Sequence, residues 1–287
     1  MNNLNSCVRA TVHGAISILN AIGSGYGSAV GISLRVVSEV RLSHGKGLNV
    51  QTELGKDLLE YLANTILPPE LLSENQINIG ITSEIPPGFG LKSSSAVTGA
   101  LSLACFKIID DKIDDKRVLN SAIAASVKAG VTFTGAFDDT AACYFGGVVI
   151  TDNRSRKLVK HFHAPETLCA VVFLPRLATR GDFMSRLPIM SDLFFDSFNL
   201  AKSGNYWKAM KLNGVIMSSV SGFDSRPMLD VLKAGAISAS ISGNGPSIAA
   251  VTSLENRKNI VDAFSQHDGR VLISKLNNEK ASVEVIE

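Results

Sequence analysis

The sequence predicts a protein that mixes α-helices and β-strands in two closely packed domains. Three observations lead to this prediction. The 287 residues exceed the usual size of one hydrophobic core. Strand-like and helix-like spacings of hydrophobic residues both recur along the chain. A polar, charged stretch at residues 151–160 separates the halves, so we predict domains at residues 1–155 and 156–287. Because no repeat or low-complexity linker is present, we expect any cleft to lie between them.

The first half reads as a strand-helix-strand unit followed by a helix and a strand. Hydrophobic residues alternate along residues 28–43 and 76–85, which predicts two strands. Between them, leucine and isoleucine recur at helical spacing over residues 54–66, and the following Pro68-Pro69 pair ends that helix. A second helical pattern covers residues 118–129, and a short strand follows at residues 147–150.

The second half contains strands, three helical patterns and a glycine-rich turn. Residues 169–174 form a continuous apolar strand. Helical patterns then occupy residues 183–202, 206–218 and 227–233. Two strands flank the turn at residues 242–247, and a helix with one or two strands closes the chain.

Composition limits the classes of partner. Hydrophobic residues make up 45% of the chain and charged residues 19%, as in ordinary globular proteins. The formal net charge is only +2 and no basic stripe is present, so we do not expect a nucleic-acid partner. His161 and His163 would share one face of a strand, but no third metal ligand lies near them in the sequence, so an exposed strand is the preferred interpretation.

Cysteine usage and the absence of a leader predict a cytoplasmic protein. The four cysteines lie far apart without a C-x-x-C pair, which indicates a reducing compartment: Cys7, Cys105, Cys143 and Cys169. The first five residues lack the features of a signal peptide, and the most apolar helical segment, residues 97–109, is too short to span a bilayer. We therefore expect no membrane association.

The strongest chemical signal is PPGFGLKSSSA at residues 86–96, which follows a predicted strand and opens a helix rich in alanine and leucine. Glycines let a backbone approach an anion closely, and the free N–H groups and positive dipole end of a helix favour phosphate. Serine hydroxyls can bind a phosphate oxygen or Mg²⁺. We expect the whole segment to bind ATP phosphates, through Pro86, Pro87, Gly88, Phe89, Gly90, Leu91, Lys92, Ser93, Ser94, Ser95 and Ala96.

Two commoner phosphate motifs do not fit this segment. A Walker A loop needs glycine where Leu91 stands, and a dinucleotide fingerprint needs glycine where Ser93 stands. A simple loop with a helix cap is the remaining alternative.

The segment resembles the phosphate-binding loop of the GHMP kinases, named for galactokinase, homoserine kinase, mevalonate kinase and phosphomevalonate kinase. Residues 240–247 (SISGNGPS) resemble the late glycine-rich loop of that superfamily, and residues 134–139 (TGAFDD) resemble its aspartate segment. The resemblance implies an α+β fold with an N-terminal domain that contains a left-handed βαβ unit and a ferredoxin-like C-terminal domain. It also implies ATP and Mg²⁺ as cofactors, with Ser94 as a metal ligand and with Gly243, Asn244 and Gly245 at the nucleotide.

The resemblance also implies the catalytic base. In many GHMP kinases the catalytic aspartate lies seven residues before the first glycine of a Gly-Gly pair, and counting back from Gly146 reaches Asp139. Its carboxylate would accept the proton of the attacking hydroxyl or orient that hydroxyl. Asp138 is the rival. For this pair, one catalytic residue and one helix N-cap is the expected division.

Within the superfamily, residues 13–21 (HGAISILNA), 90–96 and 134–139 look like the shikimate kinases of archaea. This implies transfer of the γ-phosphate of ATP to the 3-hydroxyl of shikimate. Homoserine kinase, mevalonate kinase and a metabolite sensor without turnover remain alternatives. A family glutamate that helps to hold Mg²⁺ is expected about ten residues before the catalytic aspartate, but only Lys128 stands in that neighbourhood. Arg9, Arg176 and Arg180 are candidates to bind the carboxylate of shikimate, and His13 could touch substrate or only orient its strand.

Overall fold

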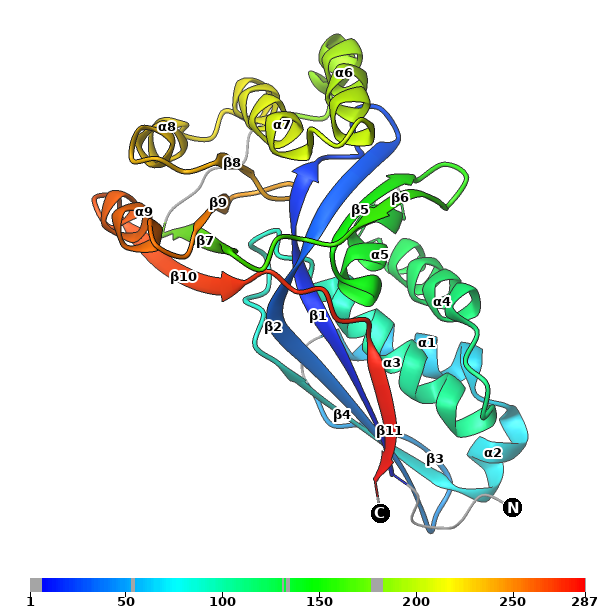
Figure 1. The fold of residues 1–287 in the computed structure, drawn as a ribbon. Coiled ribbons are helices and arrows are strands. Elements are labelled where there is room, and N and C mark those ends of the chain that lie inside the picture. The colour runs from blue at the N-terminus through cyan, green and yellow to red at the C-terminus, as the bar shows by residue number, and fades with distance from the viewer. Residues whose placement is uncertain (1–6, 53–54, 131, 133–134, 177–182, 287) are drawn as a thin grey trace.

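The computed structural model describes residues 7–52, 55–130, 132, 135–176 and 183–286. Figure 1 shows a long lobe, built on one sheet and covered on one side by helices, and a smaller lobe at one end of it. The predicted mixture of helices and strands is therefore confirmed.

The long lobe is built on a seven-stranded sheet in the order β11-β1-β2-β4-β3, with β5 paired to β2 and β6 paired to β5. Its strands are β1 (Cys7–Leu19), β2 (Tyr26–Ser43), β3 (Gly47–Val50), β4 (Gln76–Ser83), β5 (Val148–Asp152), β6 (Lys157–Phe162) and β11 (Ser282–Ile286). β3 and β4 run parallel, with α1 (Lys56–Ile66) and α2 (Pro69–Glu74) between them. These elements form a βαβ unit, and the left-handed crossover that the family resemblance implied stays a prediction.

Hydrophobic spacing explains how helices cover the sheet. Val36, Val40 and Leu42 on β2 are buried, as are Ile77 and Ile79 on β4, so alternate residues of these strands face the core. α3 (Ser93–Ile109) packs on β1 and β2 and is buried along most of its length. It is flanked by α1, α4 (Asp115–Lys128) and α5 (Phe137–Phe145), so the predicted phosphate loop is anchored to a largely buried helix.

The smaller lobe has a four-stranded antiparallel sheet in the order β10-β7-β9-β8. Its strands are β7 (Leu168–Pro175), β8 (Ser238–Ile241), β9 (Ile248–Ser253) and β10 (Gly269–Lys275). Within the described residues, three α-helices lie between β7 and β8 and one lies between β9 and β10: α6 (Ser191–Lys202), α7 (Tyr206–Ser221), α8 (Arg226–Lys233) and α9 (Arg257–Phe264). Helices after the first and third strands, with those two strands central, give the ferredoxin-like arrangement that was predicted.

The sheets divide the chain differently from the predicted boundary at residues 155 and 156. That point lies in the turn of the β5–β6 hairpin, and both strands of the hairpin belong to the large sheet. β11 also returns to this sheet and pairs with β1. The long lobe is therefore built from two separate parts of the chain. The division of the chain into two domains at residue 155 stays a prediction.

Two helical predictions need comment. A helical pattern was predicted over residues 183–202, but the α-helix begins only at Ser191. A short 3₁₀ turn at Leu187–Met190 precedes it. The first helix begins at Lys56, and residue 54, where its pattern was predicted to start, lies outside the described residues. Among the helices that the structure describes, none has the length and hydrophobicity needed to cross a membrane.

Candidate active site

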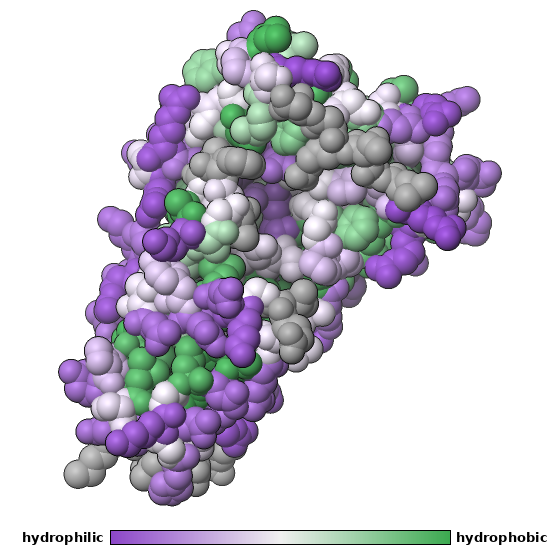
Figure 2. All heavy atoms as spheres, turned by 180° about the vertical axis from the view of Figure 1, so that it is seen from behind, coloured by the Kyte–Doolittle hydropathy of each residue, from purple (hydrophilic) through white to green (hydrophobic). Residues whose placement is uncertain are grey.

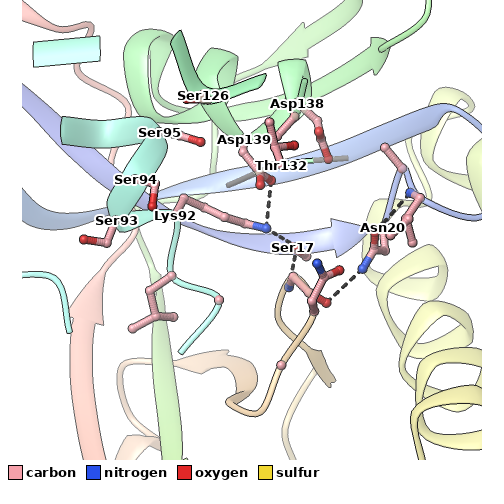
Figure 3. A pocket seen from close by; sticks show the side chains of 18 of the residues that line it. Ser17, Asn20, Lys92, Ser93, Ser94, Ser95, Ser126, Thr132, Asp138 and Asp139 are labelled. Carbon is pink, nitrogen blue, oxygen red and sulfur yellow. Dashed lines mark hydrogen bonds and ion pairs between the residues drawn. The ribbon is translucent and has the colours of Figure 1, made fainter. Parts of the chain in front are cut away.

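A cavity of about 260 Å³ lies where the phosphate loop, α5, the end of β1 and the late glycine-rich loop meet (Figure 3). Hydroxyl, carboxylate and ammonium groups dominate its wall, including those of Ser17, Lys92, Ser95 and Asp139. The face shown in Figure 2 is hollowed in its upper half, and the floor of this hollow is hydrophilic. Such a concave, polar place suits a charged ligand.

The phosphate loop has the backbone that an anion needs. Gly88 and Gly90 have φ angles of 81° and 74°, and Lys92, the N-cap of α3, has a φ of 66°. α3 then begins at Ser93, so the serines of its first turn carry N–H groups that lack an intrahelical acceptor and line the cavity. A side chain at Gly90 would overlap the carbonyl oxygen of Ser242. Glycine is thus required there by conformation and by space.

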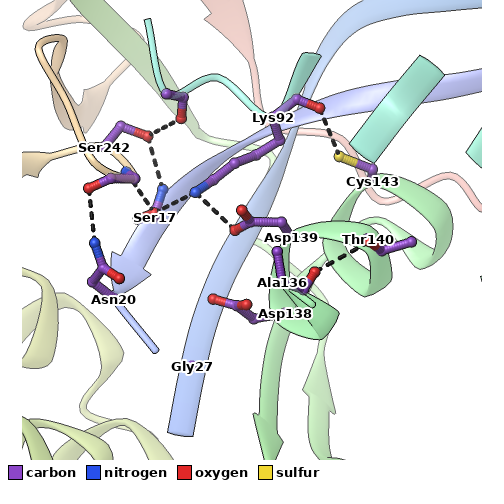
Figure 4. Close-up of polar contacts among 12 residues, drawn as sticks. Ser17, Asn20, Gly27, Lys92, Ala136, Asp138, Asp139, Thr140, Cys143 and Ser242 are labelled. Atoms are coloured by element: carbon purple, nitrogen blue, oxygen red, sulfur yellow. Dashed lines mark hydrogen bonds and ion pairs between the residues drawn. The ribbon is translucent and has the colours of Figure 1, made fainter. Parts of the chain in front are cut away.

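Lys92 and Asp139 form an ion pair inside the cavity. Lys92 Nζ lies 2.7 Å from Asp139 Oδ1, and the side chains are 4% and 20% exposed. Lys92 Nζ also donates to Ser17 Oγ at 2.8 Å. Figure 4 shows the lysine extending from the start of α3 to the aspartate on α5. A fixed cation therefore lies beside a carboxylate that still reaches the cavity.

Asp138 is held differently from Asp139. Its residue is 3% exposed, and its Oδ1 accepts a hydrogen bond from Asn153 Nδ2 at 2.7 Å. Burial, and then the neighbouring charge of Asp139, raise the pKa of Asp138 to about 7. The expected helix-cap role for one of the two aspartates is wrong: the N-cap is Ala136, without a side-chain capping bond, and both aspartates lie in the first turn of α5.

The late glycine-rich loop is tied to the long lobe by hydrogen bonds around Ser17. Ser17 Oγ accepts from Gly243 N at 2.9 Å, and Ser17 N donates to Ser242 Oγ at 3.1 Å. Ser242 Oγ in turn donates to the carbonyl oxygen of Gly90 at 2.8 Å. Asn20 Nδ2 donates to the carbonyl oxygen of Gly243 at 2.8 Å. These bonds join three segments that are distant in sequence into one wall.

Comparison with known proteins places the chain in a family. The model of the GHMP kinases N-terminal domain matches residues 55–147. A shikimate kinase of Methanobrevibacter smithii is 35% identical over 276 residues, which are 92% of this chain and 95% of the relative. A shikimate kinase of Pyrococcus abyssi is 35% identical over 270 residues, which are 91% and 96% of the two chains.

The chain belongs to the shikimate kinase family of GHMP kinases. Among solved structures, a homoserine kinase from Cytophaga hutchinsonii superposes with a TM-score of 0.78 over 99% of both chains, at 20% identity. At this identity, the superposition shows that this shikimate kinase family member shares the fold.

In this family member, most of the residues predicted from the phosphate loop and its partners line the cavity: Pro86, Gly88, Gly90, Leu91, Lys92, Ser93, Ser94, Ser95, Asp138, Asp139, Gly243, Asn244 and Gly245. Pro87 and Phe89 line a second cavity of about 740 Å³ instead, and Pro86 lines both. Ala96 is fully buried in the core beneath the loop. That these residues contact ATP stays a prediction.

The candidates for the carboxylate of shikimate are scattered. Arg9 pairs with Glu39 at 2.7 Å and lines neither cavity, whereas Arg176 lines the second cavity. Arg180 lies outside the described residues, as does Thr134 of the aspartate segment. His13 is buried away from both cavities, and burial lowers its pKa.

His161 on β6 and His163, which follows the end of that strand, are both exposed. His161 Nε2 donates to the carbonyl oxygen of Gly146. Within the described residues no three His, Cys, Asp or Glu side chains cluster as a metal ion would require.

No role was predicted for four polar residues of the cavity wall: Ser17, Asn20, Ser126 and Thr132. Ser17 and Asn20 belong to the stretch at residues 13–21 that carries the family resemblance, so that stretch was the available signal. Ser126 lies two residues before Lys128, in the neighbourhood where the family glutamate was expected. Lys128 itself is exposed and does not line the cavity.

Proposed function

We propose that this protein is a shikimate kinase, which transfers the γ-phosphate of ATP to the 3-hydroxyl of shikimate to give shikimate 3-phosphate and ADP. One observation carries the proposal. An ion pair between a buried lysine and a partly exposed aspartate lies in the cavity between the phosphate loop and the late glycine-rich loop, in a chain that relatives named shikimate kinase match over nearly all of its length. A metabolite sensor without turnover would have no need of this pair.

ATP would lie across both cavities. The second cavity has apolar walls from Ile85, Phe89 and Leu174, which suit a nucleoside base. Pro86 lines both cavities, so a nucleotide in the second cavity can direct its phosphates along the glycines toward the first turn of α3. The γ-phosphate would then face Lys92 and Asp139.

Each residue of the ion pair has a separate task in phosphoryl transfer. Asp139 Oδ1 or Oδ2 accepts the proton of the acceptor hydroxyl and aims its oxygen at the γ-phosphorus. Lys92 Nζ neutralises negative charge that spreads over the transferred group, while Ser17 holds the ammonium in place. Most of the rate gain would come from this placement and neutralisation.

Magnesium fits this wall as the partner of phosphate. Hydroxyl and carboxylate oxygens of Ser94, Ser95, Ser126 and Asp139 line the cavity, and Mg²⁺ prefers such oxygen ligands together with substrate phosphates and water. We propose Ser94 as the protein ligand, with Ser126 in the neighbourhood of the expected glutamate. When bound, the ion would neutralise the phosphates of ATP.

An acceptor panel tests the proposal. The purified protein is incubated with MgATP and shikimate, homoserine or mevalonate, ADP release is followed with a coupled assay, and the phosphate is located by ³¹P NMR. We expect shikimate 3-phosphate and little product from the two flexible alcohols. Efficient use of homoserine or mevalonate without use of shikimate would refute the substrate and leave the kinase reaction standing. A cytoplasmic location and the lack of a nucleic-acid partner stay predictions from composition.

A further inference from the structure

The cavity contains a second carboxylate that the proposed proton transfer does not use. Asp138 lines the cavity although its residue is only 3% exposed. Figure 4 places it on the side of Asp139 away from Lys92. A buried carboxylate is costly unless polar groups compensate it, so its presence in this wall calls for a ligand-binding or positioning role.

The protein holds Asp138 firmly through one oxygen. Asn153 Nδ2 donates to Asp138 Oδ1 at 2.7 Å, and Asn153 Oδ1 accepts both from Asp138 N at 3.2 Å and from Thr151 Oγ1 at 2.7 Å. A carboxylate has about four lone-pair sites. The Asn153 amide therefore fixes the orientation of the Asp138 carboxylate and leaves it further capacity to accept hydrogen bonds.

Gly27 on β2 provides the space for this carboxylate. A Cβ atom at Gly27 would overlap Asp138 Oδ2 and Cγ. The φ angle of Gly27 is not in the left-handed region, so its backbone conformation does not demand glycine. Glycine is required here because the Asp138 side chain occupies the space that a Cβ atom would need. A substitution at Gly27 is therefore a second, independent way to displace the Asp138 carboxylate.

We propose that Asp138 is an acceptor-binding residue that accepts a hydrogen bond from the hydroxyl adjacent to the one phosphorylated, so that the site selects vicinal diols. Lys92 marks the phosphate side of Asp139, and Asp138 lies on the other side, where the rest of the acceptor ring must extend. Two neighbouring carboxylates can then meet two neighbouring hydroxyls. The inference rests on the proposed function and assigns the C4 hydroxyl of shikimate to Asp138.

The test compares shikimate with 4-deoxyshikimate in the wild type and in Asp138→Asn. At pH 8, where the Asp138 carboxyl is ionised, a hydrogen bond to this charged group contributes about 1.5–3 kcal/mol, so Asp138→Asn should raise KM for shikimate about 10- to 100-fold and leave KM for ATP within about twofold. The preference of the wild type for shikimate over the deoxy analogue should fall by a similar factor in the variant. Gly27→Ala should act in the same direction because it displaces the carboxylate.

A matched glycine provides the control. Gly80 on β4 also lies in a strand, and a Cβ there would meet nothing within 4 Å, so Gly80→Ala should keep wild-type constants. If Gly27→Ala does not fold, Asp138→Asn decides, since it changes no volume. If a folded Asp138→Asn protein prefers shikimate over 4-deoxyshikimate as strongly as the wild type does, the inference is overturned and the proposed function still stands. A wild type that does not phosphorylate shikimate overturns the proposed function and this inference with it.

Discussion

Replacing Asp138 with asparagine should remove a loss of stability that the wild-type protein suffers as the pH rises. The carboxyl of an unfolded aspartate ionises near 3.8, whereas in the folded protein burial and the charge of Asp139 raise the pKa of Asp138 to about 7. Between these values the folded protein holds a proton that the unfolded chain has released. The contribution of Asp138 to the free energy of unfolding is therefore fully present below pH 3.8 and is lost progressively as the pH rises to about 7.

The size of the effect follows from the interval between the two pKa values. One pH unit corresponds to about 1.4 kcal/mol, so the interval of roughly three units makes the whole loss on the order of 4 kcal/mol. About half or more of it, roughly 2–3 kcal/mol, should fall between pH 5 and pH 8. An asparagine at position 138 fills the same volume, can still accept from Asn153, and does not titrate.

Urea unfolding of both proteins at pH 5 and pH 8 measures this. Because other titrating groups are shared, most of their effect cancels in the difference between wild type and variant. We expect the variant to gain stability relative to the wild type by roughly 2–3 kcal/mol on going from pH 5 to pH 8. An equal difference at both pH values would refute the reasoning, because it would mean that Asp138 is ionised throughout.

Three further substitutions, with a fourth as a control, test the phosphate loop and the ion pair. Asp139→Asn should lower kcat by about 10²- to 10⁴-fold with little change in KM for ATP, and wild-type turnover would contradict its role as base. Lys92→Met should lower kcat/KM by about 10²- to 10³-fold, since it removes a preorganised cation, and steady-state kinetics that match the wild type would exclude that role. Gly90→Ala should raise KM for ATP and cost more than about 1 kcal/mol of stability, because of its φ of 74° and the overlap with Ser242. Gly88→Ala, with a φ of 81° and open space around it, is the control for strain alone, so equal effects in both variants would mean that the overlap is unimportant.

The phosphate loop could be predicted because its function is local. Glycines, serines and the start of a helix follow one another within residues 86–96, and the structure brings them to one cavity. Ser17 could not be predicted in the same way. Its hydroxyl accepts hydrogen bonds from Lys92 and Gly243, which are 75 and 226 residues away in the chain. A local sequence pattern cannot predict contacts over such separations.

The roles of Asp138 and Asp139 illustrate a similar limit. Neighbouring residues share one sequence context, and their difference arises from Asn153 and Gly27, which only the folded chain brings to Asp138. The predicted boundary at residue 155 rests on composition, which has a limit of another kind. The tip of an exposed hairpin is polar and charged like a linker, so composition alone does not distinguish the β5–β6 turn from a junction between domains.

The start of α6 shows how a single residue can override periodicity. The helical pattern extends back to residue 183, but Pro188 lacks an N–H group and restricts the residue before it. The chain forms a 3₁₀ turn there and becomes α-helical only after it.

The pairing of β11 with β1 affects the order in which the protein can be built. Residues 282–286 lie opposite residues 7–11, so β1 acquires its second neighbour only after all the residues between these two strands have been synthesised. Until then β1 has an open edge of unpaired N–H and C=O groups, which can pair with another nascent chain. Contacts between such distant residues also slow folding, because a long loop must close before they form. The sheet of the long lobe therefore cannot be completed before β11 has been synthesised, whereas the sheet of the smaller lobe is contained within residues 168–275 and can form earlier.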